Sequence, residues 1–183
     1  YWLNIKISFL SFWMKSENVM QPLELSIDEI LLRQFTLLDT DAIFYLIDSN
    51  REHLSQNGDD TAVKYLTRDS VLESIANPRN PSKIRMGIWV KSNFAGSVNL
   101  HPDEKGKIAE IGCYLGAQFQ GKGYATRAII RLARYGFEIL GLEQIFAKVN
   151  KNNDSSNAVV RKLGFILSDE YNKEFYFWIK EKQ

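Results

Sequence analysis

The chain has 183 residues, of which 45% are hydrophobic and 25% are charged, and this usage is typical of one globular domain. Its 23 basic and 22 acidic residues give a formal net charge of +1, so no field of the whole chain attracts nucleic acid. The single cysteine, Cys113, excludes an internal disulfide, and no cluster of cysteines and histidines has metal-ligand spacing. These features argue against structural zinc and suit a reducing cytoplasm.

The first residues of the chain are apolar, but the stretch is too short to span a bilayer, which takes about 20 apolar residues. It also lacks the basic start and the small-residue cleavage site of a signal peptide. The chain begins without methionine, and Met14 and Met20 follow. We expect residues 1–20 to be either an extension upstream of the domain or an added element that packs on it or on a second subunit. Residues 21–183 are expected to form a single domain, with no membrane partner.

The first part of the domain predicts one strand and two helices. Residues 23–35 alternate in polarity around a Leu-Leu pair and predict a strand. Thr36 or Asp39 can cap the helix that follows. Its apolar stripe consists of Ala42, Ile43, Leu46 and Ile47. A second helix is predicted at Arg68–Ala76, because the proline that follows disfavours further helix.

The second part predicts a meander followed by mixed elements. The short, turn-rich connections between three strands indicate antiparallel pairing, and the strands are Ile84–Val90, residues 95–100 and Ile108–Leu115. Residues 123–140 carry the clearest helical period of the chain, and Gly141 closes that helix. The remaining elements are a strand, a short helix and two closing strands, at residues 145–149, 155–163, 165–167 and 175–179. This order predicts one α/β or α+β domain.

A glycine-containing turn at residues 118–126, Gln-Phe-Gln-Gly-Lys-Gly-Tyr-Ala-Thr, lies between a predicted strand and the long helix. Without side chains at Gly121 and Gly123, backbone N–H groups can approach an anion closely, and the helix start adds its positive dipole end. Lys122 and Arg127 can supply charge. A diphosphate ligand fits this turn, but an ordinary tight loop before a helix has the same pattern. The turn matches neither the NTPase P-loop nor the Rossmann signature, which needs a third glycine where Thr126 stands.

Two motifs in order resemble the GCN5-related N-acetyltransferase (GNAT) superfamily. Gln118, Gly121 and Gly123 match its Gln/Arg-x-x-Gly-x-Gly/Ala motif. The Asn-Asp-Ser-Ser run that begins at Asn153 and the Lys-Leu-Gly-Phe run that begins at Lys162 resemble its RimJ/RimL-like branch, as does the strand segment that ends at Leu115. The resemblance covers residues 84–177 well. It covers residues 23–83 only in element order and in the Asn-Arg-Glu-His-Leu run from residue 50, and it does not cover residues 1–20.

The resemblance implies a mixed, mostly antiparallel sheet of six to seven strands with flanking helices. Two parallel strands, Ile108–Leu115 and residues 145–149, are expected to splay apart around acetyl-CoA, with no metal involved. Backbone contacts to pantetheine and to the thioester oxygen are implied for Cys113, Tyr114 and Leu115. Pyrophosphate binding is implied for Gln120, Gly121, Lys122, Gly123, Tyr124, Ala125 and Thr126. Asn153 would contact pantetheine, and Arg161 or Lys162 would lie near the adenosine phosphate.

The implied reaction is direct transfer of the acetyl group from acetyl-CoA to a primary amine in a ternary complex. An amine with the pKa of lysine is mostly protonated at pH 7, so a base or a water chain must remove its proton. We predict Glu110 as this base, because strand alternation places it on the face of Gly112 and Tyr114, although a solvent-facing glutamate has the same pattern. A backbone N–H near Cys113 would stabilise the oxyanion.

The resemblance points to Ser156 as the proton donor to the departing thiolate, and this serine could also cap the helix that follows it. The tyrosine that many superfamily members use would fall near Arg161, which departs from that pattern. Cys113 lacks a partnered histidine and is expected to be a small strand residue rather than a nucleophile.

The acceptor is expected to be a protein N-terminus, a polyamine, an aminoglycoside or another small amine, and the sequence does not select among them. A carboxylate-rich pocket would favour a polycation, whereas an open groove would favour a peptide. Residues 50–60 and 78–82 are expected to build that pocket. The alternative function is a non-catalytic acyl-CoA-binding regulatory domain of the same fold. A homodimer is left open as an assembly.

Overall fold

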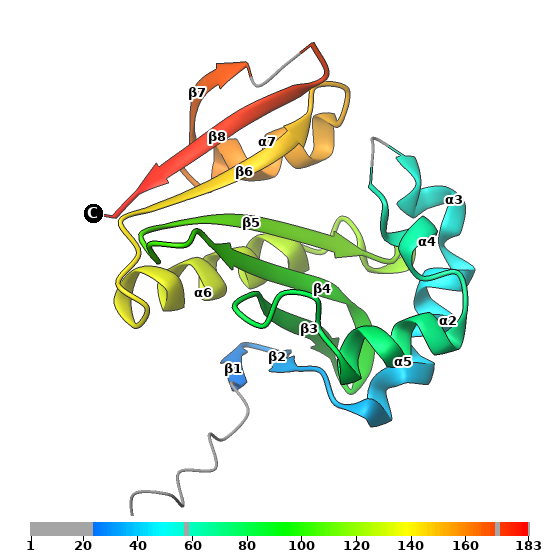
Figure 1. Cartoon of the computed structure of the whole chain (residues 1–183). Coiled ribbons are helices and arrows are strands. Elements are labelled where there is room, and N and C mark those ends of the chain that lie inside the picture. Colours follow the sequence, from blue (N-terminus) through cyan, green and yellow to red (C-terminus); the bar gives the residue numbers. More distant parts are fainter. Residues whose placement is uncertain (1–23, 57–58, 171–172, 183) are drawn as a thin grey trace, which may run out of the picture.

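The computed structural model describes residues 24–56, 59–170 and 173–182. Within these ranges the strands form one sheet in the order β1-β2-β3-β4-β5-β6-β8-β7 (Figure 1). The strands are β1 (Glu24–Ile27), β2 (Ile30–Gln34), β3 (Ile84–Val90), β4 (Asn93–Pro102), β5 (Ile108–Leu115), β6 (Gln144–Asn150), β7 (Ile166–Glu170) and β8 (Phe175–Glu181). Only β5 and β6 pair in parallel, so the predicted mixed, mostly antiparallel sheet is confirmed. The predicted extension, residues 1–20, lies outside the described residues.

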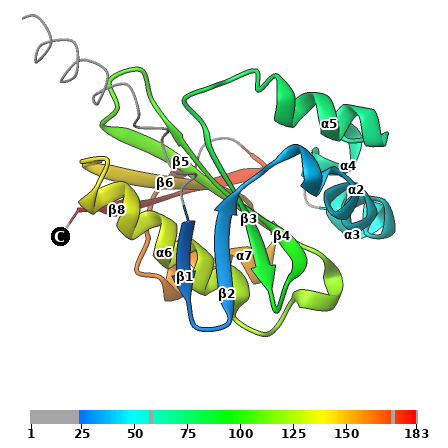
Figure 2. The same cartoon turned by 90° about the horizontal axis from the view of Figure 1, so that it is seen from below.

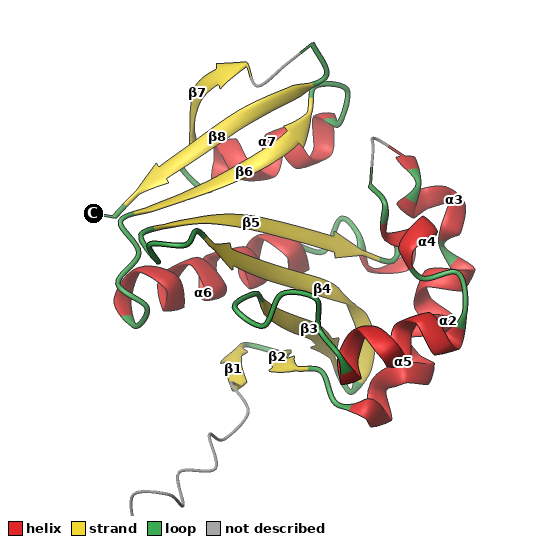
Figure 3. Cartoon of the chain, viewed as in Figure 1, coloured by secondary structure: helices red, strands yellow, loops and turns green. Residues whose placement is uncertain are grey.

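Helices cover the sheet on both faces (Figures 2 and 3). The helices are α2 (Thr40–Ser49), α3 (Arg51–Leu54), α4 (Thr61–Lys64), α5 (Arg68–Ala76), α6 (Tyr124–Glu138) and α7 (Asp154–Lys162). One core cluster joins α6 to the sheet, with Leu132 and Leu100 fully buried. A second cluster joins α2 and α5 to Trp89 and Phe94 on the opposite face. The sheet that is expected to carry the acetyl-transfer site is therefore packed on both of its faces.

The structure corrects the predicted first strand. Residues 24–34 form two strands, β1 and β2, which pair antiparallel with Ile27 opposite Ile30. Asp28 takes a positive φ of 51° in the connecting turn. Aspartate tolerates the left-handed conformation better than most residues, so this hairpin forms without glycine. The sheet consequently has eight strands in the described part of the chain, rather than six or seven.

The long helix α6 packs unusually close to the sheet at Gly136. A Cβ on this residue would lie 2.8 Å from the side chain of Leu142 and 3.1 Å from that of Leu100. The helix ends near the predicted position, and Gly141 follows with a φ of +71°, as expected of a residue that terminates a helix. This close contact fixes the axis of α6, so that its N-terminus stands just beyond the turn that follows β5.

The start of α2 is fixed by a buried ion pair. Asp39, which is 5% exposed, accepts two hydrogen bonds from Arg33 at 2.6 and 2.7 Å and one from the backbone N–H of Thr36 at 2.8 Å. Burial raises the pKa of Asp39, but the hydrogen bonds from Arg33 and Thr36 outweigh burial, and the pKa lies below its ordinary value. The Arg33 guanidinium also lies 4.1 Å from the ring centre of Trp89. These contacts attach α2 to β2 and β3.

Candidate active site

The sheet opens between its two parallel strands. β5 and β6 pair at three positions only, where Ile108, Ala109 and Glu110 lie opposite Gln144, Ile145 and Phe146. Beyond these pairs β5 continues along β4 and β6 continues along β8, and the two strands diverge (Figure 1). The predicted splayed pair is confirmed. Backbone groups on the facing edges of the strands are left for a ligand or water, because a buried peptide group without a partner is costly.

The turn after β5 has two glycines with positive φ and, within the described residues, a run of unpaired backbone donors. Gly121 and Gly123 have φ values of +73° and +75°, and a Cβ added to either would meet nothing within 4 Å. In the part of the chain that the structure describes, no acceptor pairs with the backbone N–H groups of residues 121–126. Arg127 is the first residue of the helix whose N–H has an acceptor, which is the carbonyl of Gly123. These donors at the start of α6 fit a diphosphate.

The two basic side chains near the turn, Lys122 and Arg127, have different partners. Lys122 is exposed and its Nζ donates to the carbonyl of Gln118 at 3.0 Å, so the ammonium lies beside the turn. Arg127 forms ion pairs with Asp28 at 3.1 Å and Glu29 at 3.5 Å. Arg127 therefore attaches the first turn of α6 to the β1–β2 hairpin, and Lys122 is the cation that remains close to the predicted phosphate position.

The end of β5 carries Cys113, Tyr114 and Leu115, whose backbone was predicted to contact pantetheine and the thioester oxygen. Leu115 is buried, and the other two are half-buried. Burial raises the pKa of the Cys113 thiol to about 12, with a smaller contribution from Asp59, so the thiol is neutral at ordinary pH. This agrees with a small strand residue rather than a nucleophile. Burial also raises the pKa of Tyr114, whose phenol stays protonated.

Glu110 lies on the predicted face of β5. Burial alternates along the strand: Ala109 and Ile111 are buried, whereas Glu110 and Gly112 are exposed. The register places His101 of β4 directly opposite Glu110. Side chains in such cross-strand pairs lie about 5 Å apart at Cβ. Glu110 therefore stands in a row of polar groups, rather than alone on the surface.

The same row continues toward β3. Lys83 precedes β3 and is half-buried, and burial lowers its pKa, with further lowering from Lys64 and Arg85. The Nη2 of Arg85 donates to the hydroxyl of Tyr65 at 3.2 Å, so the segment after α4 reaches this face of the sheet. We call the surface formed by Lys83, Arg85, His101 and Glu110 the acceptor face. It mixes cations with one carboxylate.

The loop at residues 78–82 also reaches the acceptor face, as expected. The side-chain nitrogen of Asn80 lies 2.6 Å from Nε2 of His101. Since only one of two nitrogens can donate, this contact fixes His101 Nε2 as an acceptor or implies the other amide orientation of Asn80. In either case the loop is attached to the residue opposite Glu110.

The start of α7 differs in detail from the sequence prediction. The helix begins at Asp154, and Asn153 caps it: its Oδ1 accepts hydrogen bonds from the N–H of Ser156 and the hydroxyl of Ser155, each at 3.0 Å. Ser156 is therefore inside the first turn and is not the capping residue. Its own hydroxyl is half-buried and makes no hydrogen bond within the described residues. The hydroxyl is free to meet a ligand.

Sequence reasoning missed Asn157, which holds α7 in place. This buried side chain donates to the carbonyls of Asn150 and Asn153 and accepts a hydrogen bond from the indole of Trp178 at 2.9 Å. It attaches α7 to the end of β6 and to β8. An asparagine on the apolar side of a helix was the available signal, because such a residue must find partners. Arg161 is exposed in the last turn of α7, with its guanidinium 5.5 Å from the ring centre of Trp178.

Three further observations concern the described residues. Among the described residues, no group of three histidine, cysteine or acidic side chains could hold a metal ion. In the same residues, no helix is long and apolar enough to cross a bilayer. A groove of about 280 Å³ lies along the second half of α6, where Ala133 and Phe137 face Phe165, away from the glycine turn.

The comparisons with known proteins agree with this geometry. The family model "Acetyltransferase (GNAT) domain" matches residues 29–166. The chain is 31% identical over 145 residues to the N-acetyltransferase YoaA of Bacillus subtilis, a match that spans 77% of this chain and 81% of the relative. It is 38% identical to the spermidine N(1)-acetyltransferase of Escherichia coli over 68 residues, which is 37% of each protein.

Solved structures show the same fold. The microcin C7 self-immunity acetyltransferase MccE, solved with acetyl-CoA and AMP, has 27% identity and a TM-score of 0.72, over 85% of this chain and 93% of that one. The ribosomal L7/L12 acetyltransferase RimL, solved with coenzyme A, has 19% identity and a TM-score of 0.77, over 87% of this chain and 98% of that one. The chain therefore belongs to the GNAT acetyltransferase family, and its reaction is the transfer of an acetyl group from acetyl-CoA to an amine.

Proposed function

We propose that the opening between β5 and β6 and the turn that follows β5 bind acetyl-CoA in an extended path. Cys113, Tyr114 and Leu115 lie at the acetyl end, and the N–H groups of residues 121–126 receive the pyrophosphate. Asn153 lies along the arm, and Arg161 lies toward the adenosine phosphate. The observation that supports this path best is the run of N–H groups without protein acceptors, at the start of a 15-residue helix.

In this proposal Glu110 is the general base. The carboxylate accepts a proton from the acceptor ammonium, directly or through one water, and the neutral amine then attacks the acetyl carbonyl. The position of Glu110 opposite His101, on the face that Lys83 and Arg85 share, supports this role.

The remaining steps use the end of β5 and the start of α7. A backbone N–H near Cys113 donates to the carbonyl oxygen as negative charge develops there. The hydroxyl of Ser156 gives its proton to the sulfur as the carbon–sulfur bond breaks, and the second proton that the attacking nitrogen loses returns through water to the serine oxygen. The lack of any hydrogen bond from this hydroxyl within the described residues supports the role, because a hydroxyl already held by the protein would have to leave its partner.

For the acceptor, we propose the N-terminal amine of a protein rather than a polyamine, and membership of the RimJ/RimL-like branch. The acceptor face carries Lys83 and Arg85 beside Glu110; burial and the nearby Lys64 lower the pKa of Lys83, whereas Glu110 and Asp60 act to raise it. Basic and acidic groups are thus mixed around the proposed acceptor position, without the dense carboxylate cluster that would favour a polycation, and such a surface suits a peptide, which brings one ammonium and a neutral backbone. We also propose a cytoplasmic location, which suits the half-buried free thiol of Cys113.

Release of free CoA in the presence of a panel of amines tests the proposal. The panel contains spermidine, kanamycin, lysine and short peptides that begin with serine or alanine. We expect turnover with the peptides and weak turnover with spermidine. Faster turnover with spermidine would contradict the choice of acceptor. Binding of acetyl-CoA without transfer to any amine would contradict catalysis and point to a regulatory acyl-CoA-binding domain.

A further inference from the structure

The Asn-Arg-Glu-His-Leu run at residues 50–54 consists of Asn50, which follows α2, and the helix α3. Its polar side chains contact two different parts of the chain. Asn50 and His53 contact the glycine turn and the residues just before it. Arg51 contacts the chain around α4. We call residues 61–66, which comprise α4 and the two residues after it, the cover segment. The run therefore stands between the proposed acetyl-CoA turn and the cover segment.

Asn50 links the run to the path of the chain after β5. Its side chain is buried, with 7% exposed. Oδ1 accepts a hydrogen bond from the N–H of Ala117 at 2.8 Å, and Nδ2 donates to the carbonyl of Leu46 at 2.8 Å. Ala117 opens the short 3-10 turn that leads from β5 to Gly121. Because a buried amide is costly to leave unpaired, the position of this turn depends on the end of α2.

His53 makes the second link on the same side. Its Nε2 lies 2.8 Å from the side-chain nitrogen of Gln120, the residue immediately before Gly121. Both side chains are more exposed than Asn50, so this contact supports the turn less strongly. Together, Asn50 and His53 hold the chain at both ends of the 3-10 turn.

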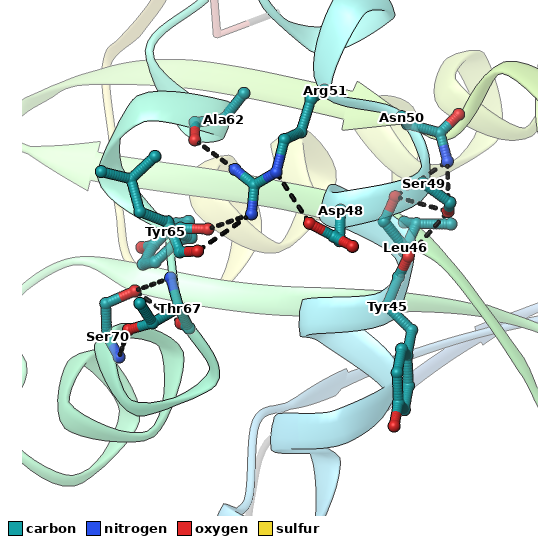
Figure 4. Close-up of polar contacts among 11 residues, drawn as sticks. Tyr45, Leu46, Asp48, Ser49, Asn50, Arg51, Ala62, Tyr65, Thr67 and Ser70 are labelled. Atoms are coloured by element: carbon teal, nitrogen blue, oxygen red, sulfur yellow. Dashed lines mark hydrogen bonds and ion pairs between the residues drawn. The ribbon is translucent and has the colours of Figure 1, made fainter.

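Arg51 faces the cover segment (Figure 4). Its Nη1 donates to the carbonyl of Ala62 at 2.8 Å, and its Nη2 donates to the carbonyls of Leu66 at 3.1 Å and Tyr65 at 3.3 Å. Nε forms an ion pair with Asp48 of α2 at 2.8 Å. A four-residue helix is too short to be stable alone, and a cation at its C-terminal carbonyls stabilises it. The position of α4 therefore depends on Arg51.

The cover segment in turn touches the acceptor face. The hydroxyl of Tyr65 accepts a hydrogen bond from Arg85, and the ring of Tyr65 packs in the cluster that includes Tyr114. A change in the position of α4 therefore changes the surface that surrounds the acceptor amine. The chain of contacts runs from the glycine turn through Asn50 and Arg51 to Tyr65.

We propose that Asn50 and Arg51 are positioning residues that couple the two substrate sites, so that coenzyme A bound at the glycine turn stabilises the cover segment over the acceptor face. The inference rests on the proposed acetyl-CoA site. A ligand that orders the turn also restricts Asn50, because Asn50 is hydrogen-bonded to Ala117. Arg51 is the next residue of the chain and is restricted with it. Coupling between two sites on one protein is reciprocal, so an acceptor that orders the cover segment tightens the hold on coenzyme A.

Amide hydrogen exchange of the whole chain, with and without saturating CoA, tests the coupling without any acceptor. The N–H groups of Val63, Lys64 and Tyr65 donate to carbonyls of Asp60 and Thr61, so their exchange reports opening of the cover segment. We expect CoA to slow this exchange by about tenfold in the wild-type protein, a usual size for coupled sites.

Two variants and one control separate the links. In Arg51→Ala, exchange of the cover segment is fast and CoA no longer slows it, while the Kd for CoA rises by no more than about tenfold, the same factor that the reciprocal coupling carries. In Asn50→Ala, the Kd rises by about 5- to 30-fold, as expected for the loss of the hydrogen bond between the buried Asn50 side chain and the N–H of Ala117, and the slowing is lost at saturation. Arg68→Ala removes an exposed ion pair with Asp41 next to the cover segment and keeps the wild-type response.

The outcomes distinguish the inference from the proposed function. If CoA binds but leaves exchange of the cover segment unchanged, or if Arg51→Ala responds like the wild type, the coupling is overturned. If CoA does not bind at all, both the proposed acetyl-CoA site and the coupling are wrong. Should Arg51→Ala prove unfolded, as judged by exchange in β3–β5, Arg51→Lys replaces it. A lysine can reach one carbonyl but not three, so we expect part of the slowing to remain.

Discussion

The substitution Gly121→Asp tests the central claim about the anion site. The aspartate would place a negative charge about 6 Å from a bound diphosphate, where two unit charges repel by about 3 kcal/mol at an effective dielectric constant of about 20. Such a loss corresponds to a rise of about 100-fold in Kd. The Cβ of the added side chain meets no protein atom within 4 Å, so it does not clash with the fold, but it occupies the space through which the backbone N–H groups approach the diphosphate. The change also costs about 1 to 2 kcal/mol in backbone strain, because φ is +73°.

Gly106→Asp is the matched control. Gly106 has a φ of +65° and open space around its Cα, but it lies in the turn before β5, at the other end of that strand from Gly121. Both variants carry the same new charge and a similar strain, so their melting temperatures should fall alike. Calorimetric titration with acetyl-CoA at low and at high salt should show weaker binding in Gly121→Asp alone, and salt should reduce the difference. Equal affinity in the two variants would refute the assignment of the turn.

Three further predictions concern the reacting end of the site. Glu110→Gln should lower kcat by about 10² to 10⁴-fold with unchanged affinity for acetyl-CoA. The exposed control Glu104→Gln should keep full activity. Full activity of Glu110→Gln would show that Glu110 is only a surface residue. Ser156→Ala should lower kcat more than the affinity for CoA, and normal turnover would remove the proton-donor role. Cys113→Ala should keep turnover, and iodoacetamide at pH 8 should modify the wild-type thiol far more slowly than free cysteine, because its pKa is about 12; rapid modification would contradict this burial.

The elements that the sequence predicted well have clear boundaries. The bounds of β3, β5 and α5 agree with the prediction, because polarity alternates or repeats within them and a turn or a proline follows. The β1–β2 hairpin was missed because its turn, at Asp28 and Glu29, contains no glycine or proline. The helices α3 and α4 have four residues each and carry no period that a pattern could reveal.

The site was predictable where the chemistry is local. The glycine turn is defined by residues within one short segment, and the face of Glu110 follows from alternation along one strand. Contacts across the fold were not predictable. That His101 stands opposite Glu110 depends on the register of β4 and β5, and the hydrogen bond between Asn50 and Ala117 joins residues 67 positions apart. Capping was considered as an alternative role of Ser156, but Asn153 is the cap and α7 begins at Asp154.

The short parallel pairing between β5 and β6 also has a mechanical consequence. Three residue pairs join the outer strands β6, β8 and β7 to the other five, and they all lie at one end of the opening. That end is reinforced by the backbone hydrogen bond from Glu143 to Lys107 at 2.8 Å and by the ion pair between their side chains at 2.6 Å. The strands on the two sides of the opening are thus joined at one end only, by these pairs and by Lys107 and Glu143, while one buried core under α6 spans both sides. The geometry at that joined end sets the width of the gap at the far end of β5, where the acetyl group is proposed to bind.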